Sequence, residues 1–243
     1  MRLVFFGTSH GVPEPNRHCS CAMVECGEHR YFVDMGMMAM DELVSRGIAP
    51  DSVKGVFLTH LHGDHIDGLL QFVDLAGWFF KTVDAAILFP DERGIQALKG
   101  WFSTLGYPLR PMDFRIIQPG VTFDDGILRV TACRTQHCDV SYAFLLEELA
   151  TGKKMLFTGD LRRPDVDFPT PLLEAHPDLI VCETAHFDAG LYEPFFKGCG
   201  AKKIFFNHYG IQYGRSGVAP IQALAKTLDM PVVIASDGME AVI

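Results

Sequence analysis

The sequence predicts an α/β fold in which two β-sheets pack against each other and helices cover their outer faces. Strand-like and helix-like runs alternate along the whole chain. Strands lie in the middle of both halves of the chain, which favours two packed sheets. Hydrophobic residues make up 48% of the 243 residues, which is enough for a large core and too many for a disordered chain.

The first half of the chain alternates between the two kinds of element. A helix is expected to end at Gly47, with Pro50 just beyond it, as helices commonly do. A second helix is indicated by apolar residues at helical spacing between Ile66 and Phe80. The predicted strands are 3–6, 22–25, 31–33, 53–58 and 86–89, and the predicted helices are 37–46, 66–80 and 93–105.

The second half begins with strands and then alternates again. Asp124, Asp125 and Gly126 form a turn sequence that is typical of a β-hairpin. No flexible linker, low-complexity tract or short-period repeat divides the chain, so residues 1–243 are expected to form one domain. The predicted strands are 114–117, 127–133, 142–146, 154–157, 179–182, 204–206 and 232–234, and the predicted helices are 191–197 and 220–228.

Charge and cysteine content restrict the classes of partner. The chain has 21 basic and 30 acidic residues, a net charge of -9, which disfavours binding to nucleic acid by bulk attraction. Its apolar runs are strand-sized, and it shows neither a signal-peptide core nor a membrane span. Seven Cys, an odd number, indicate reduced thiols. We therefore expect a cytoplasmic protein with no membrane partner.

The strongest chemical signal is the stretch 59–65, THLHGDH, between a predicted buried strand and a predicted helix. Three His and one Asp crowded together are hard to explain by packing, because such groups need a common cation. A strand that ends in a turn directs several side chains toward one point. Imidazole and carboxylate ligands suit zinc, manganese or iron. A metal site is therefore favoured over the alternative of a solvated polar loop.

Three more candidate ligands follow predicted strands in the same way. His137 comes after strand 127–133, Asp160 ends the run that follows strand 154–157, and His208 follows strand 204–206. Each alone would more often be a surface or capping residue. Their shared position at strand ends, together with the cluster at 59–65, favours a site with two metal ions.

In this order these residues resemble the metallo-β-lactamase superfamily over nearly the whole chain. The resemblance implies a four-layer αββα sandwich of two mixed β-sheets with two divalent metal ions at one edge. Zinc is the expected metal, and manganese and iron are the alternatives. His62, where the redox di-iron branch usually has Glu, favours hydrolysis over electron transfer. The implied ligands are His60, His62 and His137 for one ion, Asp64, His65 and His208 for the other, Asp160 between them, and Asp34 orienting a ligand or the loop.

Several stretches resemble ribonuclease Z, the tRNA 3′-processing endonuclease. They are 6–13, FGTSHGVP, with 16–20, NRHCS, and 62–69, HGDHIDGL. The chain also departs from that family, since Cys182 replaces its proton-donating His and Gly210 replaces the Ser of its His-x-Ser motif. Only 22 residues separate His137 from Asp160, so the inserted tRNA-clamping arm is missing.

The chain therefore looks more like compact relatives that cleave small phosphodiesters, such as phosphoribosyl cyclic phosphodiesterase. We expect a phosphodiesterase for a small or cyclic phosphodiester, acting through a hydroxide that bridges two metal ions roughly 3.5–4 Å apart. The alternatives are a ribonuclease Z-like RNA 3′-processing endonuclease with a nucleic-acid substrate, or a thioester or lactone hydrolase of the same fold. A non-catalytic binding protein is disfavoured by the complete ligand set. A homodimer is expected only by analogy with ribonuclease Z.

Roles beyond metal binding are assigned to a few side chains. Asp64 would fix an ion and orient the hydroxide, and His186 would protonate the leaving group with support from Glu183. The alternative for His186 is an ordinary residue at a helix start. The candidates for phosphate recognition are Arg162, Arg163 and Arg215, or the backbone around Ser9 and His10.

The cysteines near the N-terminus allow two interpretations. Cys19, Cys21 and Cys26, with His18 alongside, could hold a structural zinc. Their alternation also fits a half-buried strand with inert thiols, which we favour.

Overall fold

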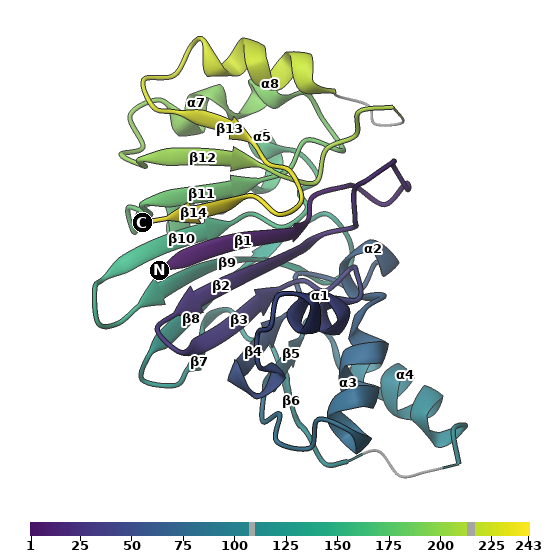
Figure 1. The fold of residues 1–243 in the computed structure, drawn as a ribbon. Helices are drawn as coiled ribbons and strands as arrows, with labels where there is room; N and C mark the ends of the chain where they lie inside the picture. The colour runs from purple at the N-terminus through teal and green to yellow at the C-terminus, as the bar shows by residue number, and fades with distance from the viewer. Residues whose placement is uncertain (107–109, 213–216) are drawn as a thin grey trace.

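The computed structural model describes residues 1–106, 110–212 and 217–243, which form two seven-stranded sheets packed face to face with helices on the outside (Figure 1). Both sheets are mixed, as expected, because antiparallel pairing on one side gives way to parallel pairing on the other. The first sheet has the order β14 (Glu240–Val242), β1 (Arg2–Gly7), β2 (Cys21–Cys26), β3 (His29–Val33), β4 (Val53–Phe57), β5 (Ala86–Phe89) and β6 (Asp113–Ile116).

The second sheet mirrors this arrangement. Its parallel strands are β10 to β13, and β7 to β10 run antiparallel. Its order is β13 (Val232–Ile234), β12 (Lys203–Phe206), β11 (Leu179–Cys182), β10 (Lys153–Phe157), β9 (Ser141–Glu148), β8 (Leu128–Thr135) and β7 (Gly120–Asp124).

Aromatic side chains fill the space between the sheets. The ring centroids of Phe57 and Phe123 are 5.1 Å apart, and those of Phe5 and Phe205 are 5.5 Å apart, so each pair joins one sheet to the other. Contacts at this distance add specific geometry to the large apolar area that they bury. This central core packs the two sheets against each other. The candidate ligands follow the ends of strands that enclose it.

Helices cover the two outer faces through separate apolar cores. The first sheet is covered by α1 (Ala39–Ser45), α3 (Leu69–Trp78) and α4 (Glu92–Ser103), with the short α2 (Gly63–Ile66) and η1 (Pro50–Ser52) nearby. The second sheet is covered by α5 (Pro164–Asp167), α6 (Thr170–Leu173), η2 (Ala189–Tyr192), α7 (Glu193–Phe196) and α8 (Val218–Ala225). None of the helices within the described ranges is both long and apolar enough to span a membrane.

The predicted strands and helices are confirmed with small shifts at their ends, and the helix predicted over 66–80 begins only at Leu69, as α3. The chain forms α2 and α3 with a break at Gly68, whose N–H donates to the Met35 carbonyl at 2.9 Å instead of continuing a helix. A Cβ atom on Gly68 would lie 1.7 Å from the Met37 carbonyl oxygen, so only glycine permits this close crossing. The break turns His65 inward, where it is 1% exposed.

Candidate metal centre

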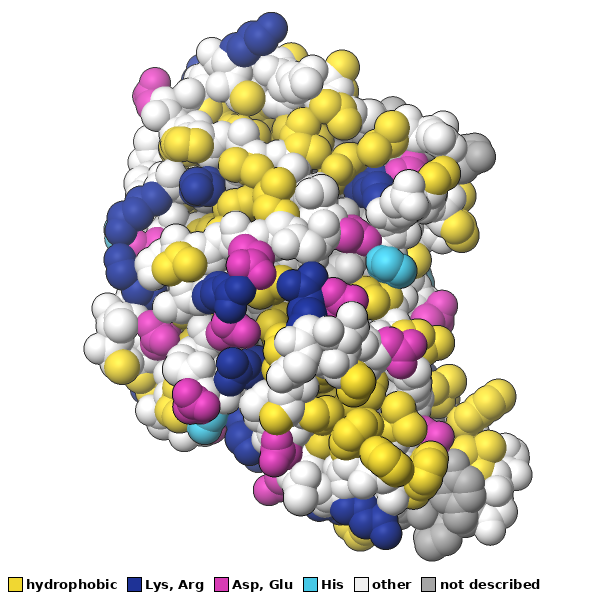
Figure 2. All heavy atoms as spheres, viewed as in Figure 1, with side chains coloured by type: hydrophobic (Ala, Val, Ile, Leu, Met, Phe, Trp, Pro, Cys, Tyr) yellow, Lys and Arg dark blue, Asp and Glu magenta, His cyan; other side chains and the backbone are white. Residues whose placement is uncertain are grey.

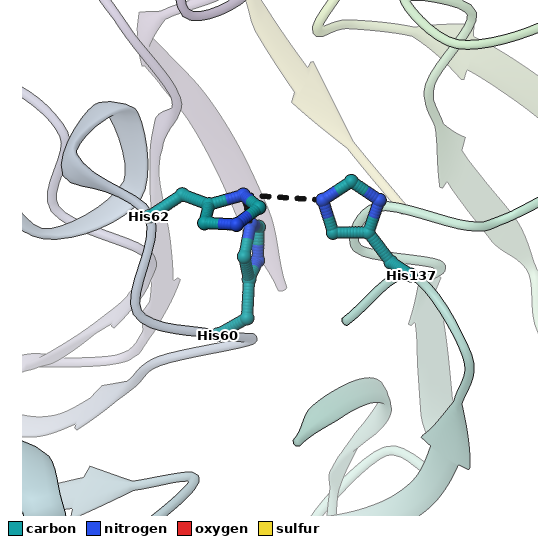
Figure 3. A group of neighbouring side chains, drawn as sticks. All are labelled: His60, His62 and His137. Atoms are coloured by element: carbon teal, nitrogen blue, oxygen red, sulfur yellow. Dashed lines mark hydrogen bonds between the residues drawn. The ribbon is translucent and has the colours of Figure 1, made fainter. Parts of the chain in front are cut away.

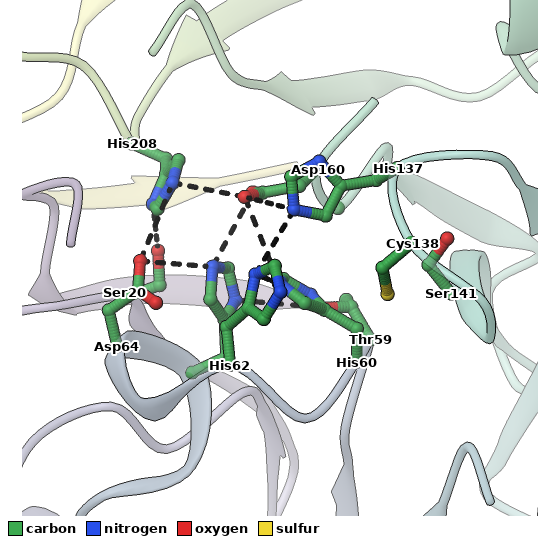
Figure 4. Close-up of polar contacts among 12 residues, drawn as sticks. Ser20, Thr59, His60, His62, Asp64, His137, Cys138, Ser141, Asp160 and His208 are labelled. Atoms are coloured by element: carbon green, nitrogen blue, oxygen red, sulfur yellow. Dashed lines mark hydrogen bonds and ion pairs between the residues drawn. The ribbon is translucent and has the colours of Figure 1, made fainter. Parts of the chain in front are cut away.

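The candidate ligands lie at one edge of the sandwich, on loops that follow the carboxyl ends of strands (Figure 4). His60 follows β4, His137 follows β8, Asp160 follows β10 and His208 follows β12. β8, β10 and β12 run in the same direction, so their loops leave the second sheet at one edge, and β4 of the first sheet brings His60 to the same place. The candidate ligands from all four loops and α2 face one another in Figure 4.

His60, His62 and His137 form one compact group (Figure 3). Nε2 of His60 lies 3.0 Å from Nδ1 of His62, which lies 3.2 Å from Nε2 of His137. Two nitrogens bound to one tetrahedral zinc ion at 2.0–2.1 Å would be about 3.3 Å apart. The spacing of the three rings therefore fits a shared metal ion.

Asp64, His65 and His208 form a second group. Oδ2 of Asp64 lies 3.5 Å from Nε2 of His65 and 3.7 Å from Nε2 of His208. Nε2 of His65 is buried and makes no hydrogen bond within the described part of the chain. An unpaired buried nitrogen that faces two carboxylates is costly unless a cation lies between them.

The carboxylate of Asp160 connects the two groups. Its Oδ1 lies 3.5 Å from Nε2 of His65, and its Oδ2 lies 3.2 Å from Nε2 of His208 and 3.6 Å from Nε2 of His137. Asp160 is 3% exposed, so water does not compete for these oxygens. The donor set of imidazoles and carboxylates fits a divalent metal cofactor.

Three candidate ligands have the protonation state that binds metal, whereas Asp160 and Asp34 outweigh burial and raise the pKa of His65, so this ring loses a proton when a metal ion binds. Burial, together with neighbouring His side chains, lowers the pKa of His60 and lowers that of His137 to about 4, so both rings are neutral at pH 7. Burial alone would raise the pKa of Asp160, but His208 and His65 outweigh it and lower the pKa well below its usual value. Neutral imidazole and ionised carboxylate are the forms that ligate metals.

Beside the cluster, the buried Glu183 pairs with His186, whose side chain is 36% exposed. Glu183 is 1% exposed and accepts hydrogen bonds from the backbone N–H groups of Leu161 and Ala185 at 2.9 and 2.8 Å. Both of its carboxylate oxygens lie 2.9 Å from Nδ1 of His186. Burial alone would lower the pKa of His186, but Glu183 outweighs it and raises the pKa to about 9. His186 is therefore protonated at neutral pH, and its ring centroid lies 4.6 Å from that of His137.

The metal-free protein is expected to be most stable near pH 6.5. Below that pH the unfolded chain protonates His137, whereas the folded chain does so only near pH 4, so stability falls as the pH drops through this window. The folded chain keeps the proton on His186 up to about pH 9, so the stability that this proton adds is lost between about pH 6.5 and 9. Urea midpoints of chelator-treated protein at about pH 5, 6.5 and 8.5 measure both effects.

Two variants assign these effects to their residues. His137→Asn should make the acid side of the profile shallower, and His186→Asn should make the alkaline side shallower. A profile that both variants change in the same way would contradict the assignment.

Hydrogen bonds to Nδ1 orient the rings of His60 and His65. Oδ2 of Asp34 lies 2.7 Å from Nδ1 of His65, and Oδ1 of Asp34 accepts a hydrogen bond from the backbone N–H of Thr59 at 2.7 Å. The Thr59 hydroxyl lies 3.0 Å from Nδ1 of His60. Such contacts fix the ring orientation, which leaves Nε2 of each ring for the metal.

The sequence did not reveal three residues that support the ligands: Ser20, Thr59 and Asp167. The Ser20 hydroxyl lies 2.8 Å from Nδ1 of His208. Asp167 is 8% exposed and accepts backbone N–H groups from Gln136, Arg162 and Arg163 at 2.7, 3.0 and 3.1 Å. Asp167 thereby ties the loop that holds His137 to the loop that follows Asp160. Thr59 could have been found from its place directly before the first ligand, but the other two act across long sequence separations.

The candidates for phosphate recognition lie in different surroundings. Ser9 and His10 are buried, and the Ser9 hydroxyl donates to the Val12 carbonyl at 3.5 Å. Arg162 is exposed, and exposed Arg163 pairs with Asp165 at 2.9 Å. Arg215 lies outside the described residues. Their role in phosphate binding stays a prediction.

All seven cysteines are free thiols. Burial raises the pKa of Cys21 and raises that of Cys26 to about 12, which keeps both thiols protonated at neutral pH. Protonated thiols are poor nucleophiles and poor metal ligands, which supports the interpretation of inert strand residues.

The two sheets and the ligand cluster at their edge define a protein of the metallo-β-lactamase fold. The fold is shared with the metallo-β-lactamase fold protein YhfI of Bacillus subtilis, with a TM-score of 0.78 and 19% identity over 99% of this chain and 98% of that one. It is also shared with the short form of human tRNase Z, with a TM-score of 0.79 and 20% identity over 100% and 99% of the two chains.

Sequence comparison assigns the chain to a family within this fold. A ribonuclease Z of Limosilactobacillus fermentum is 33% identical over 158 residues, which are 62% of this chain and 50% of that protein. The chain thus spans about half the length of the curated relatives that it matches. The family model described as anti-Pycsar protein Apyc1 matches residues 1–190, and the chain belongs to this family.

Proposed function

We propose that the protein is a metal-dependent phosphoric diester hydrolase that cleaves a small or cyclic phosphodiester. It would use two divalent metal ions, with zinc as the expected metal. The observation that carries this proposal is the carboxylate of Asp160 between two ligand groups. Its Oδ2 lies 3.6 Å from Nε2 of His137 on one side and 3.2 Å from Nε2 of His208 on the other. Two adjacent ions that share a carboxylate form a common arrangement in phosphoester hydrolases.

The chain supplies the framework for this chemistry. When bound, the ions lower the pKa of water and neutralise the charge that builds on the phosphoryl oxygens. His60, His62 and His137 would hold one ion, and Asp64, His65 and His208 the other. Because Asp34 and Thr59 fix the rings of His65 and His60, the nitrogens are oriented before any substrate binds.

His186 is the proposed proton donor to the leaving group. Nδ1 of His186 is held by Glu183, so Nε2 is the atom that can donate. In the metal-free protein the pKa of about 9 keeps this proton on the ring at neutral pH, and Nδ1 lies 3.9 Å from Oδ2 of Asp160, beside the cluster. A positioned acid of this kind lowers the barrier to expulsion of a poor leaving group.

Three observations favour a small substrate. Residues 138–159 between two candidate ligands are taken up by β9, β10 and short turns. The net charge of -9 gives a polyanion little bulk attraction. A mostly apolar cavity of about 580 Å³ lies beside Leu61, between α3 and α4, within the size range of small-molecule sites. Figure 2 shows hydrophobic side chains gathered on this face.

The second candidate function is processing of RNA 3′ ends, which the 33% identity to a ribonuclease Z favours. A substrate panel separates the two. We expect metal-loaded protein to hydrolyse cyclic mononucleotides and bis-p-nitrophenyl phosphate, and to leave a tRNA precursor with a 3′ trailer intact. Thioesters and nitrocefin serve as carbonyl substrates in the same panel. Faster cleavage of the trailer than of any small phosphodiester would reverse the order of the two proposals.

A further inference from the structure

The loop between β1 and β2, residues 8–20, lies against the loop after β12 that carries His208 (Figure 1). Ser9 and Tyr209 form an isolated β-bridge between them. His208 has a φ of 46°, in the left-handed region that a residue with a Cβ atom rarely adopts. The surroundings must hold this conformation, since the backbone alone does not favour it.

Glu14 binds the backbone that follows His208. Its Oε1 accepts the N–H groups of Ile211 and Gln212 at 2.6 and 2.8 Å. The Glu14 side chain is 2% exposed, and its Oε2 forms an ion pair with Arg17. A buried carboxylate with two backbone donors and a guanidinium partner has its charge compensated, so it holds this backbone firmly.

Arg17 binds the residue next to the ligand. Its Nη1 donates to the Tyr209 carbonyl at 2.8 Å, and its guanidinium carbon lies 4.0 Å from the centroid of the Tyr209 ring. Its Nη2 donates to the Thr8 carbonyl at 2.6 Å. The Arg17 guanidinium therefore joins the two loops, with one nitrogen bonded to its own loop at Thr8 and the other bonded to the His208 loop at Tyr209.

Ser20, at the end of the same loop, fixes the ring of His208. Its hydroxyl lies 2.8 Å from Nδ1, and both groups are buried. This contact leaves Nε2 facing the carboxylates, 3.2 Å from Asp160 and 3.7 Å from Asp64.

We propose that Glu14, Arg17 and Ser20 are positioning residues for the metal position formed by Asp64, His65 and His208. This inference rests on the proposed function, since it requires two bound ions. The contacts described for these three residues reach the His208 loop, whereas His60 and His62 come from the loop after β4 and His137 from the loop after β8. Loss of any of the three should therefore weaken one metal position and spare the other.

The test is a zinc titration of metal-free protein in competition with a chromogenic chelator. Wild-type protein should bind two equivalents. Ser20→Ala and Arg17→Met should weaken one equivalent by about 10–100-fold and leave the other unchanged. Ser20→Thr keeps the hydroxyl and should restore binding. Ser103→Ala removes an exposed hydroxyl of α4 that donates to the Gly100 carbonyl at 2.7 Å and should leave both equivalents unchanged.

The outcomes are distinct. Unchanged affinities in both Ser20→Ala and Arg17→Met would overturn the inference, as would an equal loss at both positions. Wild-type protein that binds only one equivalent would overturn the two-ion proposal itself. Thermal unfolding of each metal-free variant shows whether it is folded, and Ser20→Thr gives a second reading if Ser20→Ala is not.

Discussion

Asp160→Ala is expected to reduce phosphodiester hydrolysis by at least about 10³-fold, which corresponds to about 4 kcal/mol of transition-state stabilisation. The carboxylate lies between the two ligand groups, within 3.6 Å of nitrogens from both. Its removal takes away the ionised group that compensates several buried imidazoles, so metal content should fall together with turnover. Steady-state rates and metal content of purified protein measure the two effects.

A matched control is available on the same side of the molecule. Asp165 is half exposed and pairs with Arg163 on the surface of α5, so Asp165→Ala should leave rate and metal content unchanged. Asp160→Asn keeps the shape and one acceptor oxygen, and should fall between wild type and Asp160→Ala. An Asp160→Ala protein that keeps its metal and stays within tenfold of the wild-type rate would contradict the bridging assignment.

His186→Ala is expected to cost about 10²–10⁴-fold with an alkyl leaving group and only a few-fold with p-nitrophenol. An alkoxide is a poor leaving group and needs a proton as the bond breaks, whereas p-nitrophenolate leaves without one. Glu183→Gln should follow the same pattern more weakly, because it removes the charge that raises the pKa of His186. Rates for a pair of diesters that differ only in the leaving group give the comparison.

His29→Ala, at the start of β3 and bonded to Tyr31 at 3.3 Å, is the matched histidine control and should change neither rate. An equal loss on both diesters in His186→Ala would remove His186 from the role of acid. The residue would then support the site only through its contact with Glu183.

The candidate ligands were visible in the sequence because they are encoded locally. His60, His137, Asp160 and His208 each come within three residues of a strand end, and Asp64 and His65 follow His60 in α2. The pattern His60, His62, Asp64 and His65 places four donors within six residues, so no long-range information was needed to find the cluster. The structure brings them together with His137, Asp160 and His208.

The supporting contacts could not be predicted, because they join distant parts of the chain. Ser20 meets His208 across 188 residues, and Glu14 meets Gln212 across 198. Their acceptors and donors include backbone atoms, which carry no sequence signal of their own. The role of Asp167 could not be predicted either, because the groups that it binds are backbone N–H groups.

Weak hydrophobic patterns explain the elements that were missed. In β7 only Phe123 is buried, and in β14 only Ala241 is buried, so neither strand shows a clear alternation. The break between α2 and α3 depends on a close crossing at Gly68 by the chain near Met37. The apolar stripe includes Ile66, so the predicted helix began three residues before α3.

The most direct test of metal-dependent phosphodiester hydrolysis uses bis-p-nitrophenyl phosphate and protein of known metal content, in zinc, manganese and iron forms. We expect turnover that depends on bound metal, disappears on chelation and is lost in Asp64→Ala. Asp64 is one of the three residues that would hold the second ion. Protein that binds two metal equivalents and yet hydrolyses neither this diester nor any cyclic phosphodiester would contradict the central claim.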